Sequence, residues 1–485
     1  MTHRDHPHLL EIAAWPWLVR LSSRFRRRVT LATVPAEVWD VIAGRGFDDV
    51  YLMGVWRRSP LGGELARADP ALIAEYDRVL PGWTADDVPG SPYCISAYEP
   101  DDRMGGWAGL DAARDALHDR GLRLIVDFVP NHTGFDHPWV RSHPERYVLG
   151  EEADLEAAPA DYRRLGGAIV ACARDPHFEP WRDVAQLNYF NPDTRSAMLG
   201  MLQSIAAYAD GVRCDMAMLV LNDVFDRTWR RLLRERWPVP RAEFWPGATA
   251  TVPSLVYLAE VYWDLESTLQ QQGFDFTYDK RLLDRLQGPA ADVRAHLLAE
   301  APFRDRLTRF LENHDEPRSA ARLGHRLAAA ATTLATLPGM RFYFDGQLEG
   351  ARLRAPVQLG RWPDEPVPAG VATLYERLLK ATDDDLFHAG AWELLNIRPA
   401  GDASHENLIA WQWRLGGRRA ITVVNLGTSS AQGHVRLENL PRGEAWNFED
   451  QLTGARYHWR RESLVATGLY VRLDAGAAHL LIPVQ

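Results

Sequence analysis

The sequence predicts an α/β protein made of a (β/α)8 TIM barrel followed by a C-terminal antiparallel β-sandwich. Over roughly the first 380 residues, eight short apolar runs alternate with amphipathic stretches, which is the pattern of repeated strand–helix units. From residue 388 onwards, short alternating runs are separated by glycine-rich turns, which is typical of a sandwich. At 485 residues the chain is long enough for one large domain and one smaller domain.

The predicted strands and helices follow one another in a regular order. The first strand is Leu9–Ile12, and Val38, Val41 and Ile42 then form an i, i+3, i+4 stripe that predicts a buried helix face before the second strand, Val50–Met53. The other six apolar runs are Leu122–Val126, Gly211–Met216, Leu255–Val261, Phe274–Tyr278, Leu307–Leu311 and Met340–Phe344. Eight such units predict a closed barrel with its active site at the carboxyl ends of the strands.

Two long insertions interrupt this order. Residues 59–95 follow the second strand, and residues 133–186 follow the third. Both are too long for ordinary loops of a barrel and leave from the face of the expected site, so we expect them to shape a pocket. The predicted organisation is a catalytic barrel over residues 1–387, including the 133–186 insertion as a short second domain, and a sandwich over residues 388–485.

The predicted sandwich has four clear alternating runs. They are Leu408–Trp413, Ala420–Asn425, His434–Leu437 and Ala478–Pro483. Trp411 and Trp413 share one face of the first run because the side-chain period of a strand is two. Such a pair can bind a glucan, although it more often packs inside a sandwich, and both interpretations stay open.

The composition is that of an ordinary globular protein, with 46% hydrophobic and 25% charged residues. A net charge of -10 argues against a nucleic-acid partner. Cys94, Cys172 and Cys214 show neither a disulfide framework nor metal-ligand spacing, so we expect reduced thiols. The first residues lack the layout of a signal peptide, and no apolar run approaches the ~20 residues of a membrane helix, so we expect a cytoplasmic protein without a membrane partner. The oligomeric state is not predicted.

Polar residues end four of the predicted strands. The four segments are Asp127-Phe-Val-Pro-Asn131-His132, Gly211-Val-Arg213-Cys-Asp215, Ala259-Glu260-Val-Tyr262 and Glu312-Asn313-His314-Asp315. A single aspartate at a strand end is usually a cap or a surface residue. Four such segments in this order, all at one face of a barrel, predict an active site.

Two of these carboxyl groups suit the cleavage of an acetal. Asp215 and Glu260 end neighbouring predicted strands, which lie about 4.8 Å apart in a sheet. A retaining glycosidase needs two carboxyl groups about 5–5.5 Å apart. We therefore expect Asp215 to attack the anomeric carbon and form a glycosyl-enzyme, and Glu260 to act as general acid and base with a pKa raised by burial.

Other residues of the four segments are expected to support them. Arg213 shares a strand face with Asp215 and would keep that carboxylate ionised. Asp315 would bind sugar hydroxyls, and Tyr93 would stack under the same sugar ring. Cys214 points the other way, into packing.

Four further residues of these segments have expected roles. His132 and His314 are expected to be neutral hydrogen-bond partners of sugar hydroxyls, and Asp127 is expected to hold Arg213 or a loop in place. Asn131 can ligate Ca²⁺ or simply form a turn. No cofactor is expected to be required, with a structural Ca²⁺ as the one possibility.

At these residues the sequence resembles glycoside hydrolase family 13, the α-amylase family. Its signatures match Asp127–His132, Gly211–Asp215, Glu260 and Asn313–Asp315, and the resemblance covers almost the whole chain. It implies a retaining enzyme that acts on α-glucosidic bonds in α-linked gluco-oligosaccharides or glucans. The run from Asn313 to Arg318 is closer to oligosaccharide α-glucosidases than to starch α-amylases, so Arg318 is added to the expected substrate-binding residues.

The sequence departs from the family at three places. Met218 and Leu219 stand where starch-cleaving α-amylases usually have a Lys-His pair, and Tyr93-Cys94 stands in place of a Tyr-Asp pair. The 133–186 insertion is short for the domain that carries the family's main calcium site, which weakens the expectation of an ion at Asn131.

Two other kinds of function stay open, one that uses the same site for transfer and one without catalysis. A transglycosylase or a phosphorylase would form the same glycosyl-enzyme and pass the sugar to another acceptor. A non-catalytic carbohydrate-binding relative would keep the fold without turnover. The sequence alone does not select the linkage or the choice between endo and exo action.

Overall fold

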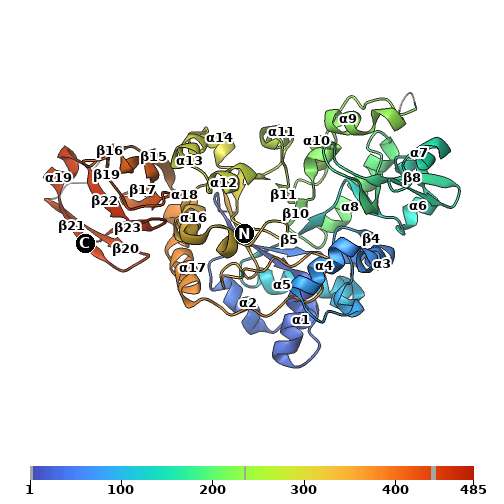
Figure 1. The fold of residues 1–485 in the computed structure, drawn as a ribbon, viewed down its shortest axis with the longest axis horizontal. Coiled ribbons are helices and arrows are strands. Elements are labelled where there is room, and N and C mark those ends of the chain that lie inside the picture. The colour runs from blue at the N-terminus through green and yellow to red at the C-terminus, as the bar shows by residue number, and fades with distance from the viewer. Residues whose placement is uncertain (1–3, 234–235, 439–443, 485) are drawn as a thin grey trace.

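The computed structural model describes residues 4–233, 236–438 and 444–484. Its centre is a closed barrel of eight parallel strands that neighbour one another in chain order (Figure 1), which confirms the predicted fold class. The strands are β1 (His8–Ala13), β2 (Asp49–Met53), β5 (Arg123–Phe128), β10 (Gly211–Cys214), β11 (Val256–Ala259), β12 (Phe276–Tyr278), β13 (Leu307–Arg309) and β14 (Met340–Phe344). Each predicted apolar run contains or overlaps one of them.

The strands are apolar on both faces because the barrel buries both. In β2, Tyr51 and Met53 face the barrel interior, whereas Val50 and Leu52 pack outwards against the surrounding helices. The predicted stripe before β2 lies on α2 (Ala36–Ala43) and is partly wrong, since Val38 and Ile42 are buried but Val41 is 57% exposed. Val41 lies at the edge of a groove, where the neighbouring helix does not cover it.

The remaining helices surround the barrel. They are α1 (Ala14–Phe25), α5 (Gly106–His118), α8 (Pro192–Ala206), α9 (Asn222–Leu233), α10 (Phe244–Thr251), α11 (Glu266–Gln271), α12 (Lys280–Arg285), α13 (Ala290–Leu297), α14 (Ala301–Arg304), α15 (Ser319–Arg322), α16 (Leu327–Thr336), α17 (Ala369–Thr382) and α18 (Asp385–Ala389). The start of α8 shows local control by sequence, because the Asn191 side chain accepts from the Asp193 N–H and Pro192 occupies the first helical position. None of the helices that the structure describes combines the length and the apolar character of a bilayer-spanning segment.

Both predicted insertions are folded. The first contains β3 (Trp56–Arg58), α3 (Pro60–Ala68), α4 (Pro70–Val79) and β4 (Ile95–Pro100). The second contains β6 (His132–Gly134), α6 (Pro138–Ser142), α7 (Glu152–Ala157), β7 (Tyr162–Leu165), β8 (Ala168–Ala173) and β9 (Trp181–Gln186). Its strands form one small sheet in the order β6-β9-β8-β7, and Figure 1 shows this unit at the end of the molecule opposite the C-terminal domain.

The C-terminal domain consists of two antiparallel sheets around an apolar core. The larger sheet contains β15 (Ala391–Leu395), β17 (Leu408–Leu415), β18 (Arg418–Asn425), β23 (Ala478–Val484), β20 (Ala445–Asp450) and β21 (Arg456–Arg460). The smaller sheet contains β16 (Ile397–Pro399), β19 (Ala431–Val435) and β22 (Leu469–Leu473), and α19 (Arg461–Ala466) follows β21. The strand expected at His434–Leu437 therefore lies three residues earlier, where it pairs with β16 and β22.

Trp411 and Trp413 fulfil neither role considered for them. Both are fully buried, and they pack with the barrel's helices and not with the core of the sandwich. The Trp411 indole N–H donates to Thr336 Oγ1 at 3.2 Å, and that of Trp413 donates to the Thr336 carbonyl at 2.6 Å. Thr336 ends α16, so this tryptophan pair joins the C-terminal domain to the barrel.

Candidate active site

Two neighbouring strands set the positions of Asp215 and Glu260. In the register of β10 and β11, Cys214 pairs with Ala259, so the two acids are the first residues beyond their strands. Their amides continue the ladders, with Asp215 N donating to Phe128 O at 2.8 Å and Glu260 N donating to Cys214 O at 3.0 Å. Both side chains are almost fully buried at the carboxyl end of the barrel.

Arg213 connects these two acids. Its Nη1 donates to Asp215 Oδ1 at 2.6 Å, and its Nη2 lies 2.7 Å from Glu260 Oε2 as an ion pair. The guanidinium is fully buried and lies over the rings of Tyr93 (5.2 Å) and Tyr278 (5.8 Å). One rigid, permanently charged fork therefore fixes both carboxyl groups relative to each other.

Burial and neighbouring charges act differently on the pKa values of the two acids. Burial raises the pKa of Glu260 to about 7 against the opposing effect of Arg213, and the nearby Asp215 and Asp315 add to the shift. Burial also raises the pKa of Asp215, while Arg213 favours its ionised form by charge and by a hydrogen bond. Because two carboxylates this close repel each other, one proton stays on the pair, and Glu260 is its natural position.

Glu260 is also held by two hydrogen bonds. The Tyr262 hydroxyl donates to Oε1 at 2.9 Å, and the Met216 N–H donates to Oε2 at 2.8 Å. The backbone around both acids is strained, since Met216, Trp263 and Asp264 have positive φ angles of 41°, 64° and 64°. Such conformations cost about 1–3 kcal/mol each in residues other than glycine and are found mainly at functional sites.

Asp315 presents the most accessible carboxylate of the group, with its side chain 51% exposed. His314 Nε2 lies 3.0 Å from Asp315 Oδ2 and 2.7 Å from the Tyr93 hydroxyl, and the Tyr93 and His314 rings stack at 5.3 Å. Burial opposes the charge of Asp315, but His314 outweighs it and lowers the pKa of Asp315 to about 2. Asp315 is thus ionised and reachable from the mouth of the barrel.

The contacts of His314 favour its charged form, in contrast to the expected neutral state. Burial disfavours its charge, but Asp315 on one ring nitrogen and Glu11 on the other raise its pKa well above the ordinary value. Glu11 Oε1 lies 2.5 Å from His314 Nδ1. Burial lowers the pKa of His132 to about 4, which favours the expected neutral form, and its ring packs against Trp181 at 5.5 Å, while its contact with sugar hydroxyls stays a prediction.

Asp127 holds the loop that follows β2. It accepts hydrogen bonds from the Tyr51 hydroxyl and, at 2.6 Å, from the Gly54 N–H. Gly54 has a φ of +79°, which a side chain would disfavour. From the sequence, Asp127 is expected to hold either a loop or Arg213. Its hydrogen bonds go to the loop. Arg213 acts on Asp127 only by its charge, which favours the ionised form of Asp127.

The surroundings of Asn131 do not fit a calcium ion. Its side-chain oxygen accepts from Gln186 Nε2 at 2.9 Å, so the atom expected to ligate the ion is occupied by an N–H donor. Among the residues that the structure describes, no group of three or more His, Cys, Asp or Glu side chains is arranged to hold a metal. The structure thus assigns Asn131 to a hydrogen bond between β9 and the end of β5.

Arg318 is not brought to the acids. It is buried, donates to Glu312 Oε1 at 2.8 Å and to the Asp345 carbonyl at 2.7 Å, and lies over the Phe344 ring at 4.4 Å. The guanidinium thus donates to Glu312 and Asp345, away from the two acids, and not to a substrate as expected.

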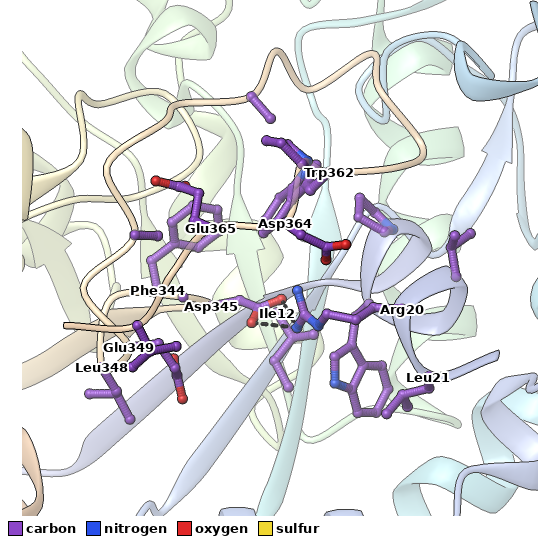
Figure 2. Close-up of a pocket in the computed structure, with 18 of the residues that line it drawn as sticks. Ile12, Arg20, Leu21, Phe344, Asp345, Leu348, Glu349, Trp362, Asp364 and Glu365 are labelled. Atoms are coloured by element: carbon purple, nitrogen blue, oxygen red, sulfur yellow. Dashed lines mark hydrogen bonds and ion pairs between the residues drawn. The ribbon is translucent and has the colours of Figure 1, made fainter. Parts of the chain in front are cut away.

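Arg318 borders a cavity of about 850 Å³ beside the barrel. Figure 2 shows Arg20 paired with Asp345 across this cavity, near Trp362 and Phe344. None of the described residues that line it is Asp215, Glu260 or Asp315, so the cavity is separate from the carboxyl groups.

Glu11 and Tyr51 are residues that sequence reasoning missed. A usable signal was present for Glu11, a single acid inside the apolar run Leu9-Leu-Glu-Ile12. Met218 and Leu219, by contrast, are almost fully buried, so they supply no polar contact on the leaving-group side.

The fold and this arrangement define a (β/α)8 barrel protein with two paired carboxyl groups at the carboxyl ends of its strands. No family model matches the chain. The chain is 27% identical to α-amylase MalA of Haloarcula japonica over 71% of its own length and 48% of that protein. It is 24% identical to α-1,4-glucan:maltose-1-phosphate maltosyltransferase 2 of Streptomyces coelicolor over 90% of its own length and 62% of that protein.

Among solved structures, the maltogenic α-amylase AmyB of Thermotoga neapolitana superposes over 100% of both chains with a TM-score of 0.69 at 18% identity. The two curated relatives, an α-amylase and a maltosyltransferase, support the resemblance to glycoside hydrolase family 13, the α-amylase family, and the solved structure has the same fold. It spans about half to three-fifths of the length of the two curated relatives named above.

Proposed function

We propose that the protein is a retaining α-glycosidase that hydrolyses α-glucosidic bonds in α-linked gluco-oligosaccharides or α-glucans. The observation that carries this proposal is the Arg213 guanidinium in contact with both Asp215 and Glu260. This fork orients one carboxylate for attack and a second carboxyl group for proton transfer, which are the two functions that retention requires.

The reaction proceeds in two steps. Asp215 attacks the anomeric carbon while Glu260 gives its proton to the leaving oxygen, and a glycosyl-enzyme forms on Asp215. Glu260, now a carboxylate, then takes a proton from water, which attacks the anomeric carbon and releases the sugar with its original configuration. Asp315 binds sugar hydroxyls of the same ring and strengthens this contact as the ring flattens.

We propose that the substrates are short oligosaccharides, that no cofactor is required and that the protein acts in the cytoplasm. The run Asn313–Arg318 supports the first point, and three free, buried cysteines support the last. A second acceptor class is favoured by one observation, since the maltosyltransferase relative aligns with 90% of this chain. A transglycosylase or phosphorylase would use the same residues and exclude water from the second step.

The test is product profiling of the purified protein on maltose to maltoheptaose, isomaltose, trehalose, sucrose and starch, with and without phosphate and excess acceptor. Sugar released into water, with the α-anomer appearing first by NMR, supports the hydrolase. Longer sugars or a sugar phosphate move the assignment to a transferase. Asp364→Asn, in the separate cavity, is the matched control for Asp215→Asn. A product that Asp215→Asn also releases at the wild-type rate rejects the proposal.

A further inference from the structure

Glu11 is a fully buried acid inside the barrel. It lies on β1, between β2 and β14, where its neighbours across the ladders are Tyr51 and Phe344. Its Oε1 contacts His314 Nδ1 at 2.5 Å, and none of the described residues gives a hydrogen bond to Oε2. An isolated buried carboxylate costs several kcal/mol unless a charged partner offsets it, so this position requires a reason.

Titratable side chains contact both ring nitrogens of His314. Glu11 from β1 contacts Nδ1, while Asp315 and the Tyr93 hydroxyl share Nε2. Asp127 from β5 is near enough to be influenced by the charge of the imidazole. With an acceptor on each nitrogen, the ring can satisfy both Glu11 and Asp315 only when both nitrogens carry protons.

The charge balance of the barrel mouth points the same way. Its carboxyl groups are Glu11, Asp127, Asp215, Glu260 and Asp315. Against them stands the buried guanidinium of Arg213, while Arg354 donates to the backbone oxygen of Asp315 at 3.0 Å and its charge also favours the ionised form of Asp315. A protonated His314 adds a second buried cation, placed beside the carboxylate that substrate reaches.

We propose that Glu11 is a positioning residue that keeps the imidazole of His314 doubly protonated and oriented, so that His314 holds the Asp315 carboxylate in place for the sugar. This inference rests on the proposed function, which it deepens. Glu11 does not touch the reacting atoms, and acts only through His314. The Glu11 carboxylate thus sets the highest pH at which His314 stays charged and at which Asp315 binds the sugar ring well.

Glu11→Gln tests this, because it keeps the shape and a hydrogen bond but removes the charge. The substrate is 4-nitrophenyl α-glucoside, whose leaving group needs little proton donation, so that Glu260 does not dominate the profile. In the variant, the pKa of His314 should fall toward about 6.5. We expect kcat/KM close to wild type at pH 5.5 and about tenfold lower at pH 8, mainly through KM.

Two variants separate charge from packing. Glu11→Asp keeps the charge with a shorter reach, and should restore activity at pH 8 at least in part. Glu312→Gln removes another fully buried acid paired with a cation, Arg318, and should lower stability without moving the pH at which the rate falls. A Glu11→Gln profile parallel to wild type at every pH overturns the proposal.

NMR of ring-labelled histidine gives a readout that does not depend on activity. In the wild-type protein, one histidine signal, assigned by its loss in His314→Gln, should stay doubly protonated at pH 8. A neutral ring at pH 7 contradicts the inference even if the enzyme is active. If the wild type cleaves no glucoside, the proposed function fails, while this measurement still decides the charge of His314.

Discussion

Buried charge collects at both ends of the barrel, and the two ends use it in opposite ways. At the carboxyl end, acids outnumber cations: Glu11, Asp127, Asp215 and Glu260 are buried around Arg213. Burial and mutual repulsion leave at least one of them protonated near neutral pH, and Asp315 beside them is open to solvent. This end therefore has acidic groups whose charge can change during a reaction.

Around Arg341 at the amino end, histidines lie beside cations and are neutral. Arg341 donates to His8 Nε2 at 2.9 Å and to the Phe387 carbonyl at 2.6 Å. Because a guanidinium can only donate, His8 must accept with a bare nitrogen. His388 likewise faces Arg4 with one nitrogen and contacts the His6 carbonyl at 2.8 Å with the other.

This difference suggests that the buried charge at the amino end stabilises the barrel, whereas the buried charge at the carboxyl end serves a reaction. The donors of Arg341 are met by carbonyls and a neutral ring, which leaves no group directed at a ligand. The carboxyl end keeps repelling acids together and strained backbone at Met216, Trp263 and Asp264, which stability alone would not favour. Four predictions test this contrast.

The largest effect is expected for Asp215→Asn. Loss of the nucleophile should reduce kcat by about 10⁴-fold or more, measured with maltotriose. Stability should stay equal or rise, because the change removes one of the repelling carboxylates. A large drop in melting temperature would place Asp215 with the structural residues and break the contrast.

Glu260→Gln should cost about 10²–10⁴-fold on a natural disaccharide and much less on 4-nitrophenyl α-glucoside. For the wild type on the disaccharide, the pKa of Glu260 near 7 sets the sign of the pH dependence: kcat/KM falls as pH rises through about 7, because the proton donor is lost. Equal losses on both substrates would exclude Glu260 as the acid.

At the amino end, Arg341→Met should lower the free energy of unfolding by roughly 2–4 kcal/mol, because it leaves the Leu337 and Phe387 carbonyls without their donor. Activity per folded molecule should change less than threefold. Urea denaturation and kcat on the same preparation measure both quantities. A catalytic defect with normal stability would reverse the roles of the two ends.

The last prediction concerns acid stability, and it tests the amino end without any change in the active site. Burial, reinforced by Arg341, lowers the pKa of His6 and of His388 to about 3 and that of His8 well below normal. The unfolded chain binds these protons near pH 6.5, so stability is complete above that pH and decreases below it, by about 1.4 kcal/mol per pH unit for each histidine. Urea titrations from pH 4 to 8 should show this slope, and His8→Gln should make it shallower by one proton.

Most of the barrel could be predicted from the sequence, since each strand lies in an apolar run, and Asp215 and Glu260 each follow a strand directly. The positions of Asp215 and Glu260 need only the register of two adjacent strands. The contact of Glu11 with His314 joins residues 303 positions apart and depends on closure of the barrel, which local patterns do not encode. The charge of His314 depends on that contact, so it was misjudged for the same reason.

The misplaced roles of Arg318 and Asn131 have another cause. Their residue types and motifs suit contact with a substrate or an ion. In the folded protein, however, Arg318 donates to Glu312, and Asn131 accepts from Gln186. In the C-terminal domain, strands such as β16 and β22 are short or mixed in pattern and gain their partners only in the folded sheet.

The tryptophan pair on β17 limits how this protein can be dissected. A chain cut before residue 388 would leave the surface of α16 that Trp411 and Trp413 cover facing water, and would remove both indole donors from Thr336. The excised barrel should therefore aggregate instead of forming a smaller enzyme. The C-terminal domain therefore covers a surface of the barrel that would otherwise be exposed. Point substitutions, and not truncation, are the way to test the roles of the two domains.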